Sequence, residues 1–124
     1  MGSAGESIIV EVQTDRDRYR VGEPVGMRLR VSNNGALPVE LVFPSAQRYD
    51  FVVFKDGEEV WRWSRGRVFA MVLGVMVLKP GEGKTFVETW RPAGCAPGKY
   101  RVVGMIVCKP AFEAACIVEI GNAF

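Results

Sequence analysis

Residues 43–64 read FPSAQRYDFVVFKDGEEVWRWS, and the fold of the chain is predicted from this stretch. At its centre, the dipeptide Asp56-Gly57 separates two runs that are rich in aromatic and β-branched residues. Such runs on both sides of Asp-Gly are the strongest short-range signal for a β-hairpin. We therefore predict two adjacent antiparallel strands here.

The register of this hairpin is predicted from the residues that it would bring together. We expect a three-residue loop, Lys55-Asp56-Gly57, in which Gly57 takes the left-handed conformation that other residues resist. This loop sets aromatic against aromatic and acid against base across the strands: Tyr49 opposite Trp63, Phe51 opposite Trp61, and Asp50 opposite Arg62. A two-residue loop would lose these favourable cross-strand pairs.

Alternating apolar and polar residues predict further strands on both sides of the hairpin. The clearest alternation points four apolar side chains inward: Val25, Met27, Leu29 and Val31. Shorter runs separated by turn signals lie at residues 8–12, 39–43, 75–78, 85–90, 100–108 and 116–120. We also interpret the apolar run at residues 68–78 as buried strand, since a membrane span needs about 20 apolar residues. The pattern predicts an all-β fold, an immunoglobulin-like antiparallel β-sandwich of about eight or nine strands.

The length and composition indicate one ordinary globular domain. A chain of 124 residues with 48% hydrophobic and 24% charged residues can bury a single core. Residues 1–7 carry neither a basic region nor an apolar run, so we expect a flexible N-terminal tail without a signal peptide. A single β-sandwich domain is expected over residues 8–124. The net charge of +2 is too small to indicate nucleic acid or a membrane as a partner.

The sequence offers little of the chemistry that enzymes use. It has no histidine, which removes the commonest general base and the commonest metal ligand. It also lacks a phosphate-binding loop, so we expect neither enzymatic activity nor a cofactor or metal. The three cysteines have no CxxC spacing, and reduced thiols in a cytoplasmic protein are the expected state. A disulfide between Cys108 and Cys116 stays an alternative.

A cluster of tryptophan and arginine follows the hairpin, and these residue types are frequent at binding hot spots. Its members are Trp61, Arg62, Trp63, Arg65, Arg67 and Phe69. Two interpretations stay open: the tryptophans fill the core and the arginines form a wet face, or the cluster forms an interface.

In its order of motifs, the chain resembles the bacterial intracellular proteinase inhibitors of the BsuPI type. The resemblance is carried by VSNN at residues 31–34, FPSAQRYDF at 43–51, VWRWS at 60–64, LKPGE at 78–82 and ETW at 88–90. Two departures from the family are visible. The usual Ser-Gly-Gln is Ser45-Ala46-Gln47 here, and the usual Met-Phe-Thr-Gln is Val68-Phe69-Ala70-Met71.

The resemblance implies a cytoplasmic protein that binds and occludes an intracellular subtilisin-type serine protease. Two loops are candidates for the contact, residues 64–71 and residues 91–99, and we favour the first because the family motifs are densest there. The candidate protein-binding residues are Arg62, Ser64, Arg65, Arg67, Phe69 and Met71. The alternative is a non-inhibitory immunoglobulin-like module that binds another protein.

Overall fold

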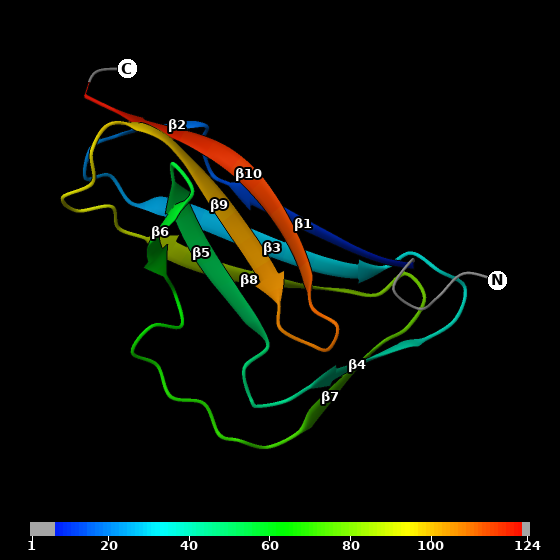
Figure 1. The fold of residues 1–124 in the computed structure, drawn as a ribbon. Coiled ribbons are helices and arrows are strands. Elements are labelled where there is room, and N and C mark those ends of the chain that lie inside the picture. Colours follow the sequence, from blue (N-terminus) through cyan, green and yellow to red (C-terminus); the bar gives the residue numbers. More distant parts are fainter. Residues whose placement is uncertain (1–6, 123–124) are drawn as a thin grey trace.

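The computed structural model describes residues 7–122 and contains ten β-strands (Figure 1). In chain order they are β1 Ile8–Thr14, β2 Arg18–Arg20, β3 Val25–Asn33, β4 Val39–Phe43, β5 Tyr49–Lys55, β6 Glu58–Arg62, β7 Gly74–Leu78, β8 Gly83–Trp90, β9 Gly98–Ile106 and β10 Phe112–Gly121. The expected all-β sandwich is confirmed. The additional strand is the three-residue β2, which the alternation of apolar and polar residues did not predict. Of the expected N-terminal tail, residues 1–6 lie outside the described residues.

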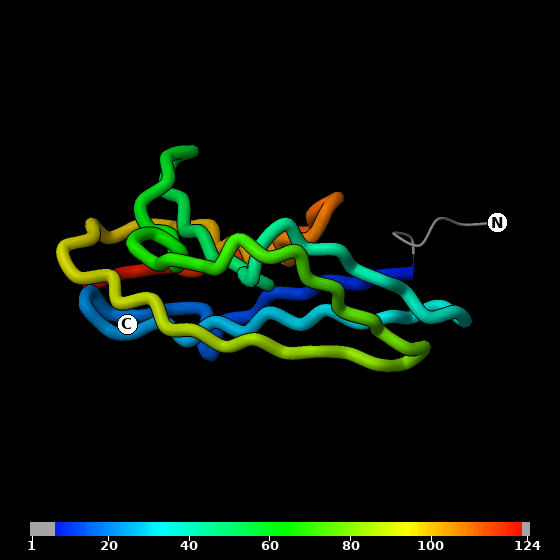
Figure 2. The backbone as a smooth tube through the Cα atoms, turned by 90° about the horizontal axis from the view of Figure 1, so that it is seen from below, coloured from blue at the N-terminus to red at the C-terminus, as the bar shows by residue number. Residues whose placement is uncertain are grey.

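The strands form two large sheets and one small ribbon. One sheet has the order β1-β3-β8, the second has the order β2-β10-β9-β5-β6, and β4 pairs with β7 alone. All pairs are antiparallel except the pair of β2 with β10. Seen from below, the two large sheets stack as two layers (Figure 2).

The core lies between these layers and follows the predicted alternation. The inward residues of β3 are all buried, with Val25, Leu29 and Val31 at 0% exposure. A side chain at Gly104 on β9 would place its Cβ 2.8 Å from Leu29 Cδ1, so glycine at this position allows the sheets to approach closely. The aromatic centre of the core is Trp90, whose ring lies 5.3 Å from that of Tyr100.

The predicted register of the central hairpin is wrong. Val52 lies opposite Arg62, Val53 opposite Trp61, and Lys55 opposite Glu58. Asp56 and Gly57 both have positive φ angles, 52° and 81°, as a two-residue turn requires. This turn matches the twist of the strands, and a register shift at Val53/Phe54 then displaces the remaining pairs. The aromatic pairing across the strands is therefore not what sets the turn.

The apolar run at residues 68–78 is strand only from Gly74 onward, so the prediction of buried strand is wrong for residues 68–73. Val68 is 97% exposed and Met71 is 85% exposed. The reason lies in the partner strand, since β4 ends at Phe43 and Pro44 has no N–H to continue the pairing. Residues 68–73 have no strand to pair with and form a loop.

The structure also decides the expectations for Trp61 and for the cysteines. Trp61 is half-buried at the margin of the core, whereas Trp90 is the fully buried tryptophan. The three cysteines are free thiols, so the alternative of a Cys108–Cys116 disulfide is not realised. The Tyr100 hydroxyl donates to the Ala96 carbonyl oxygen at 2.5 Å, tying the β8–β9 loop to β9.

Candidate functional site

The candidate site is the β6–β7 loop, residues 63–73, which joins β6 of the five-stranded sheet to β7 of the small ribbon. It runs as a long irregular segment along the lower edge of the molecule in Figure 1. Because a strand lies at each end, both ends of the loop are held by regular hydrogen bonding. Between its ends, the loop is fixed by side chains and by a few backbone hydrogen bonds.

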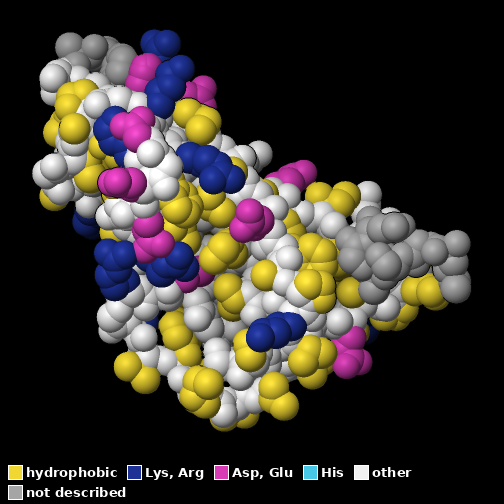
Figure 3. All heavy atoms as spheres, viewed as in Figure 1, with side chains coloured by type: hydrophobic (Ala, Val, Ile, Leu, Met, Phe, Trp, Pro, Cys, Tyr) yellow, Lys and Arg dark blue, Asp and Glu magenta, His cyan; other side chains and the backbone are white. Residues whose placement is uncertain are grey.

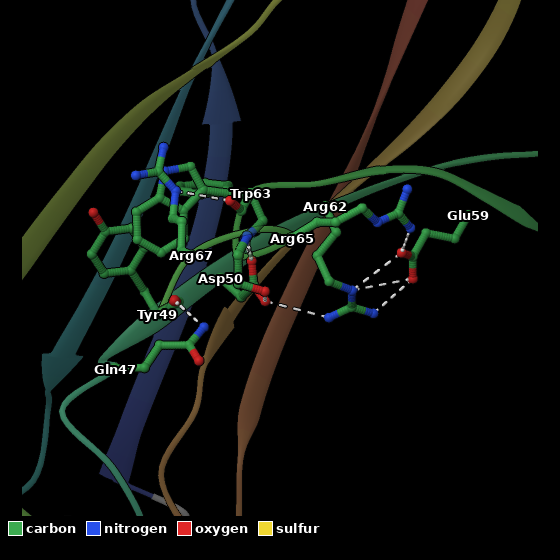
Figure 4. Close-up of polar contacts among 10 residues, drawn as sticks. Gln47, Tyr49, Asp50, Glu59, Arg62, Trp63, Arg65 and Arg67 are labelled. Atoms are coloured by element: carbon green, nitrogen blue, oxygen red, sulfur yellow. Dashed lines mark hydrogen bonds and ion pairs between the residues drawn. The ribbon is translucent and has the colours of Figure 1, made fainter. Parts of the chain in front are cut away.

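A buried carboxylate holds the start of the loop (Figure 4). The Asp50 side chain is only 4% exposed, and it accepts hydrogen bonds from the Phe51 amide at 2.9 Å and the Ser64 amide at 3.1 Å. The Ser64 hydroxyl donates to it at 2.5 Å, and Arg62 Nη1 lies 3.3 Å from Oδ2. A buried carboxylate needs such partners. Ser64 and Arg62 are therefore used within the protein.

A second acidic residue, Glu59, holds two arginines beside the loop. Its carboxylate accepts from Arg62 Nη2 at 2.7 Å and from Arg65 Nη2 at 2.6 Å. The hydrogen bond from Arg62 is the main cause that lowers the pKa of Glu59, and the same bond raises the pKa of Arg62. Exposed ion pairs contribute little stability, so their effect here is mainly on orientation. Arg65 is exposed, but its guanidinium is directed back toward β6.

Aromatic stacking holds the next part of the loop. The Trp63 ring lies 4.7 Å from that of Tyr49 and 5.9 Å from that of Phe69. The Arg67 guanidinium lies 4.3 Å above the Trp63 ring, and its Nε donates to the Trp63 carbonyl at 2.9 Å. Tyr49 itself donates to Glu88, and burial together with this bond raises the pKa of Tyr49 to about 12. Phe69 and Arg67 thus pack onto the body of the protein.

The far part of the loop is fixed at two points by residues 45–48. The Ala46 amide donates to the Ala70 carbonyl at 2.9 Å. Arg48 packs so closely against Gly74 that a Cβ there would lie 2.3 Å from Nη2, and Arg48 Nη1 donates to the Ser45 carbonyl at 2.9 Å. Residues 45–47 and 68–71, the two segments that depart from the family motifs, are therefore joined by the hydrogen bond between Ala46 and Ala70.

Between these fixed points the loop presents apolar side chains to solvent. Val68 is 97% exposed, Met71 85%, Val72 62% and Leu73 77%. Figure 3 shows hydrophobic side chains along the lower edge, where Figure 1 places the β6–β7 loop. Isolated exposed apolar residues are ordinary, but consecutive ones on a held loop indicate a contact surface.

The structure thus divides the six candidate residues. Three of them are at least half-buried: Arg62, Ser64 and Phe69. Two are exposed but contact a partner within the protein, Arg65 on Glu59 and Arg67 on Trp63. Met71 is exposed to solvent. Sequence reasoning missed Val72 and Leu73, because the run was interpreted as buried. It placed Asp50 beside Arg62 but missed the hydrogen bonds that Asp50 accepts from Phe51 and Ser64. The local pattern carried no signal for the exposure of Val72 and Leu73, because a continuous apolar run is typical of a buried strand.

The alternative loop, predicted at residues 91–99, covers residues 91–97 in the structure because β9 begins at Gly98. It has a different surface. Pro92 is buried, the Cys95 amide donates to the Pro92 carbonyl at 3.2 Å, and within the described chain the large exposed hydrophobic residues lie elsewhere. Over residues 7–122, three or more potential metal ligands do not come together. Nor does that part of the chain contain a helix with the length and apolarity for crossing a membrane.

The family model for BsuPI, described as an intracellular proteinase inhibitor, matches residues 12–111 of the sequence. The chain belongs to the BsuPI family. The match includes the whole β6–β7 loop and the strands that hold it. Among curated proteins, none matches the chain significantly.

Solved structures similar to this BsuPI-family protein support the fold. Spo0M, a sporulation control protein from Bacillus subtilis, aligns with a TM-score of 0.62 and 18% identity over 94% of this chain. The chain spans 50% of the length of Spo0M. The CARDB domain of PF1109 from Pyrococcus furiosus aligns with a TM-score of 0.56 and 18% identity, covering 94% of each chain. At this identity the likeness concerns the β-sandwich alone.

Proposed function

We propose that this BsuPI-family protein inhibits a cytoplasmic serine protease of the subtilisin type by placing the β6–β7 loop in its active-site cleft. The family supports inhibition of a proteinase. We choose this loop because residues 71–73 are exposed and apolar, and because residues 45–48 hold the chain on both sides of them, at Ala70 and at Gly74.

The held loop suits inhibition because ordering a flexible segment on binding costs affinity. Each immobilised side chain costs about 0.5–1.5 kcal/mol, and a loop already held in shape avoids part of this cost. The Asp50 network, the Trp63 stack and the Ala46–Ala70 hydrogen bond supply that restraint. The loop meets the protease already close to its bound shape.

The backbone of residues 71–73 is also available for pairing. Outside its strands, the described chain makes one backbone hydrogen bond to residues 68–73, and the acceptor of that bond is the Ala70 carbonyl. Proteins that recognise extended peptides add them as a strand through main-chain hydrogen bonds. A protease cleft would supply such partners to Met71, Val72 and Leu73. Occlusion then needs no chemistry from the inhibitor, in accord with a sequence that has no histidine.

The test is a titration of an intracellular subtilisin-type protease with the protein, measuring residual activity on a peptide substrate. We expect near-stoichiometric loss of activity at micromolar concentrations. Full activity at a several-fold excess of the protein would contradict inhibition of that enzyme and favour a non-inhibitory interaction module.

A matched pair of variants tests whether the loop makes the contact. Leu73 is 77% exposed in the loop, and Leu37 is 73% exposed in the β3–β4 turn. That turn lies at the opposite end of the β4–β7 ribbon from the loop (Figure 1). Leu73→Asp should weaken inhibition at least about tenfold, whereas Leu37→Asp should leave it unchanged. Equal inhibition by both variants would place the contact outside the loop.

A further inference from the structure

The arginines next to the loop are occupied within the protein. Arg62 contacts Glu59 and Asp50, Arg65 contacts Glu59, and Arg67 lies on Trp63. A protease that cleaves after basic residues needs a free cationic side chain for its specificity pocket, and using one of these would break an existing contact. The side chains that are ready to enter a pocket are apolar.

Among the four exposed apolar side chains of the loop, two are unbranched at Cβ, Met71 and Leu73. Val68 and Val72 carry two heavy atoms on Cβ, which restrict χ1 and widen the side chain at its base. A narrow, deep pocket accepts an unbranched side chain more easily. Met is also flexible and polarizable, and it adapts to an irregular apolar pocket.

The backbone distinguishes Met71 from Leu73. Leu73 is followed directly by Gly74, which already pairs with Phe43 on β4. Met71 is followed by Val72 and Leu73, which lie before the first residue of β7. It is preceded by Ala70, whose carbonyl is held by the Ala46 amide at 2.9 Å. Met71 is also the more exposed residue, at 85% against 77%.

We propose that Met71 is the residue that enters the specificity pocket of the target protease, and that this protease prefers an unbranched apolar residue at the position of cleavage. The inference rests on the proposed function. It assigns the partner a deep apolar pocket and excludes one that carries a carboxylate for binding Arg or Lys. Met71 acts by binding alone, because occlusion requires no bond to be made or broken.

The experiment measures the inhibition constants of five chains against subtilisin: the wild type, Met71→Leu, Met71→Val, Met71→Asp and a control variant outside the loop. We expect Met71→Leu to stay within about threefold of the wild type, because it remains apolar and unbranched at Cβ. Met71→Asp should raise the inhibition constant about 30-fold or more, and Met71→Val should fall between them. Leu37→Asp, in the β3–β4 turn, serves as the control, with a change below about threefold. Thermal unfolding of each variant should match the wild type, because Met71 and Leu37 are both exposed.

The outcomes separate the two proposals. If the wild type does not inhibit, the proposed function fails, and the assignment of Met71 fails with it. If the wild type inhibits and Met71→Asp inhibits equally well, the assignment alone is overturned. Loss of inhibition by Leu73→Asp rather than by Met71→Asp would move the pocket-filling residue to Leu73 and would also overturn the assignment of Met71.

Discussion

Replacing Asp50 by alanine should loosen the β6–β7 loop and destabilise the protein. The carboxylate is 4% exposed and accepts from two backbone amides, of Phe51 and Ser64, and from the Ser64 hydroxyl. A hydrogen bond to a charged group contributes about 1.5–3 kcal/mol, and desolvation of the carboxylate offsets part of the sum. We expect a net loss of about 3 kcal/mol in the free energy of unfolding. For a chain of this size, that lowers Tm by about 10 °C.

Two assays separate stability from function for Asp50→Ala. Urea unfolding gives the change in free energy, and protease titration at a temperature where the variant is folded gives the change in inhibition. We expect weaker inhibition as well, because Ser64 no longer holds the start of the loop. Asp17→Ala is the control, since Asp17 is exposed and its removal should change stability by less than about 0.5 kcal/mol. If Asp50→Ala unfolds like this control and inhibits like the wild type, the Asp50 network does not hold the loop.

Three other predictions concern the body of the protein. Trp90→Ala should lower the free energy of unfolding, measured in urea, by about 3–5 kcal/mol. Trp61→Ala should lower it clearly less, because Trp90 is fully buried and Trp61 is not. Equal losses for the two variants would contradict this. Gly104→Ala should cost about 1–3 kcal/mol in the same assay, because its Cβ would lie 2.8 Å from Leu29 Cδ1; unchanged stability would show that the sheets separate easily. The pKa of Tyr49 is raised from 10.0 to about 12 in the folded protein, so this tyrosine ionises at lower pH in the unfolded chain. The contribution of Tyr49 to stability should therefore be constant below pH 10 and be lost between pH 10 and 12. When unfolding is measured against pH, Tyr49→Phe should make this loss of stability less steep. An identical pH profile for Tyr49→Phe would exclude this tyrosine as the cause.

The fold could largely be predicted from the sequence because period-two alternation reports burial directly. The inward residues of β3 were predicted individually, and each is buried. The hairpin was located correctly from Asp56-Gly57, but its register was not. Favourable cross-strand pairs contribute less than about 1 kcal/mol each, which is too little to decide between registers. The conformation of the two-residue turn and the register shift beyond it decide instead.

The sequence predicts where the candidate loop lies but not how its side chains are arranged, and its role in binding stays a prediction. Residues 64–71 lie within the observed loop of residues 63–73, and Met71 is exposed there. Arg62 and Ser64 gain their roles from Asp50, a residue brought next to them only by the pairing of β5 with β6. The exposure of Val72 and Leu73 depends on where β4 ends, since a shorter partner strand leaves them unpaired. Such non-local facts are not contained in the local pattern of an apolar run.

The most direct measurement for the central claim is amide hydrogen exchange on the complex with a subtilisin-type protease whose catalytic serine is replaced by alanine. That replacement prevents digestion while leaving the cleft open. We predict strong protection of residues 70–73 on binding, with little change at residues 91–97. Protection of residues 91–97 instead, or no protection in residues 63–73, would contradict the account.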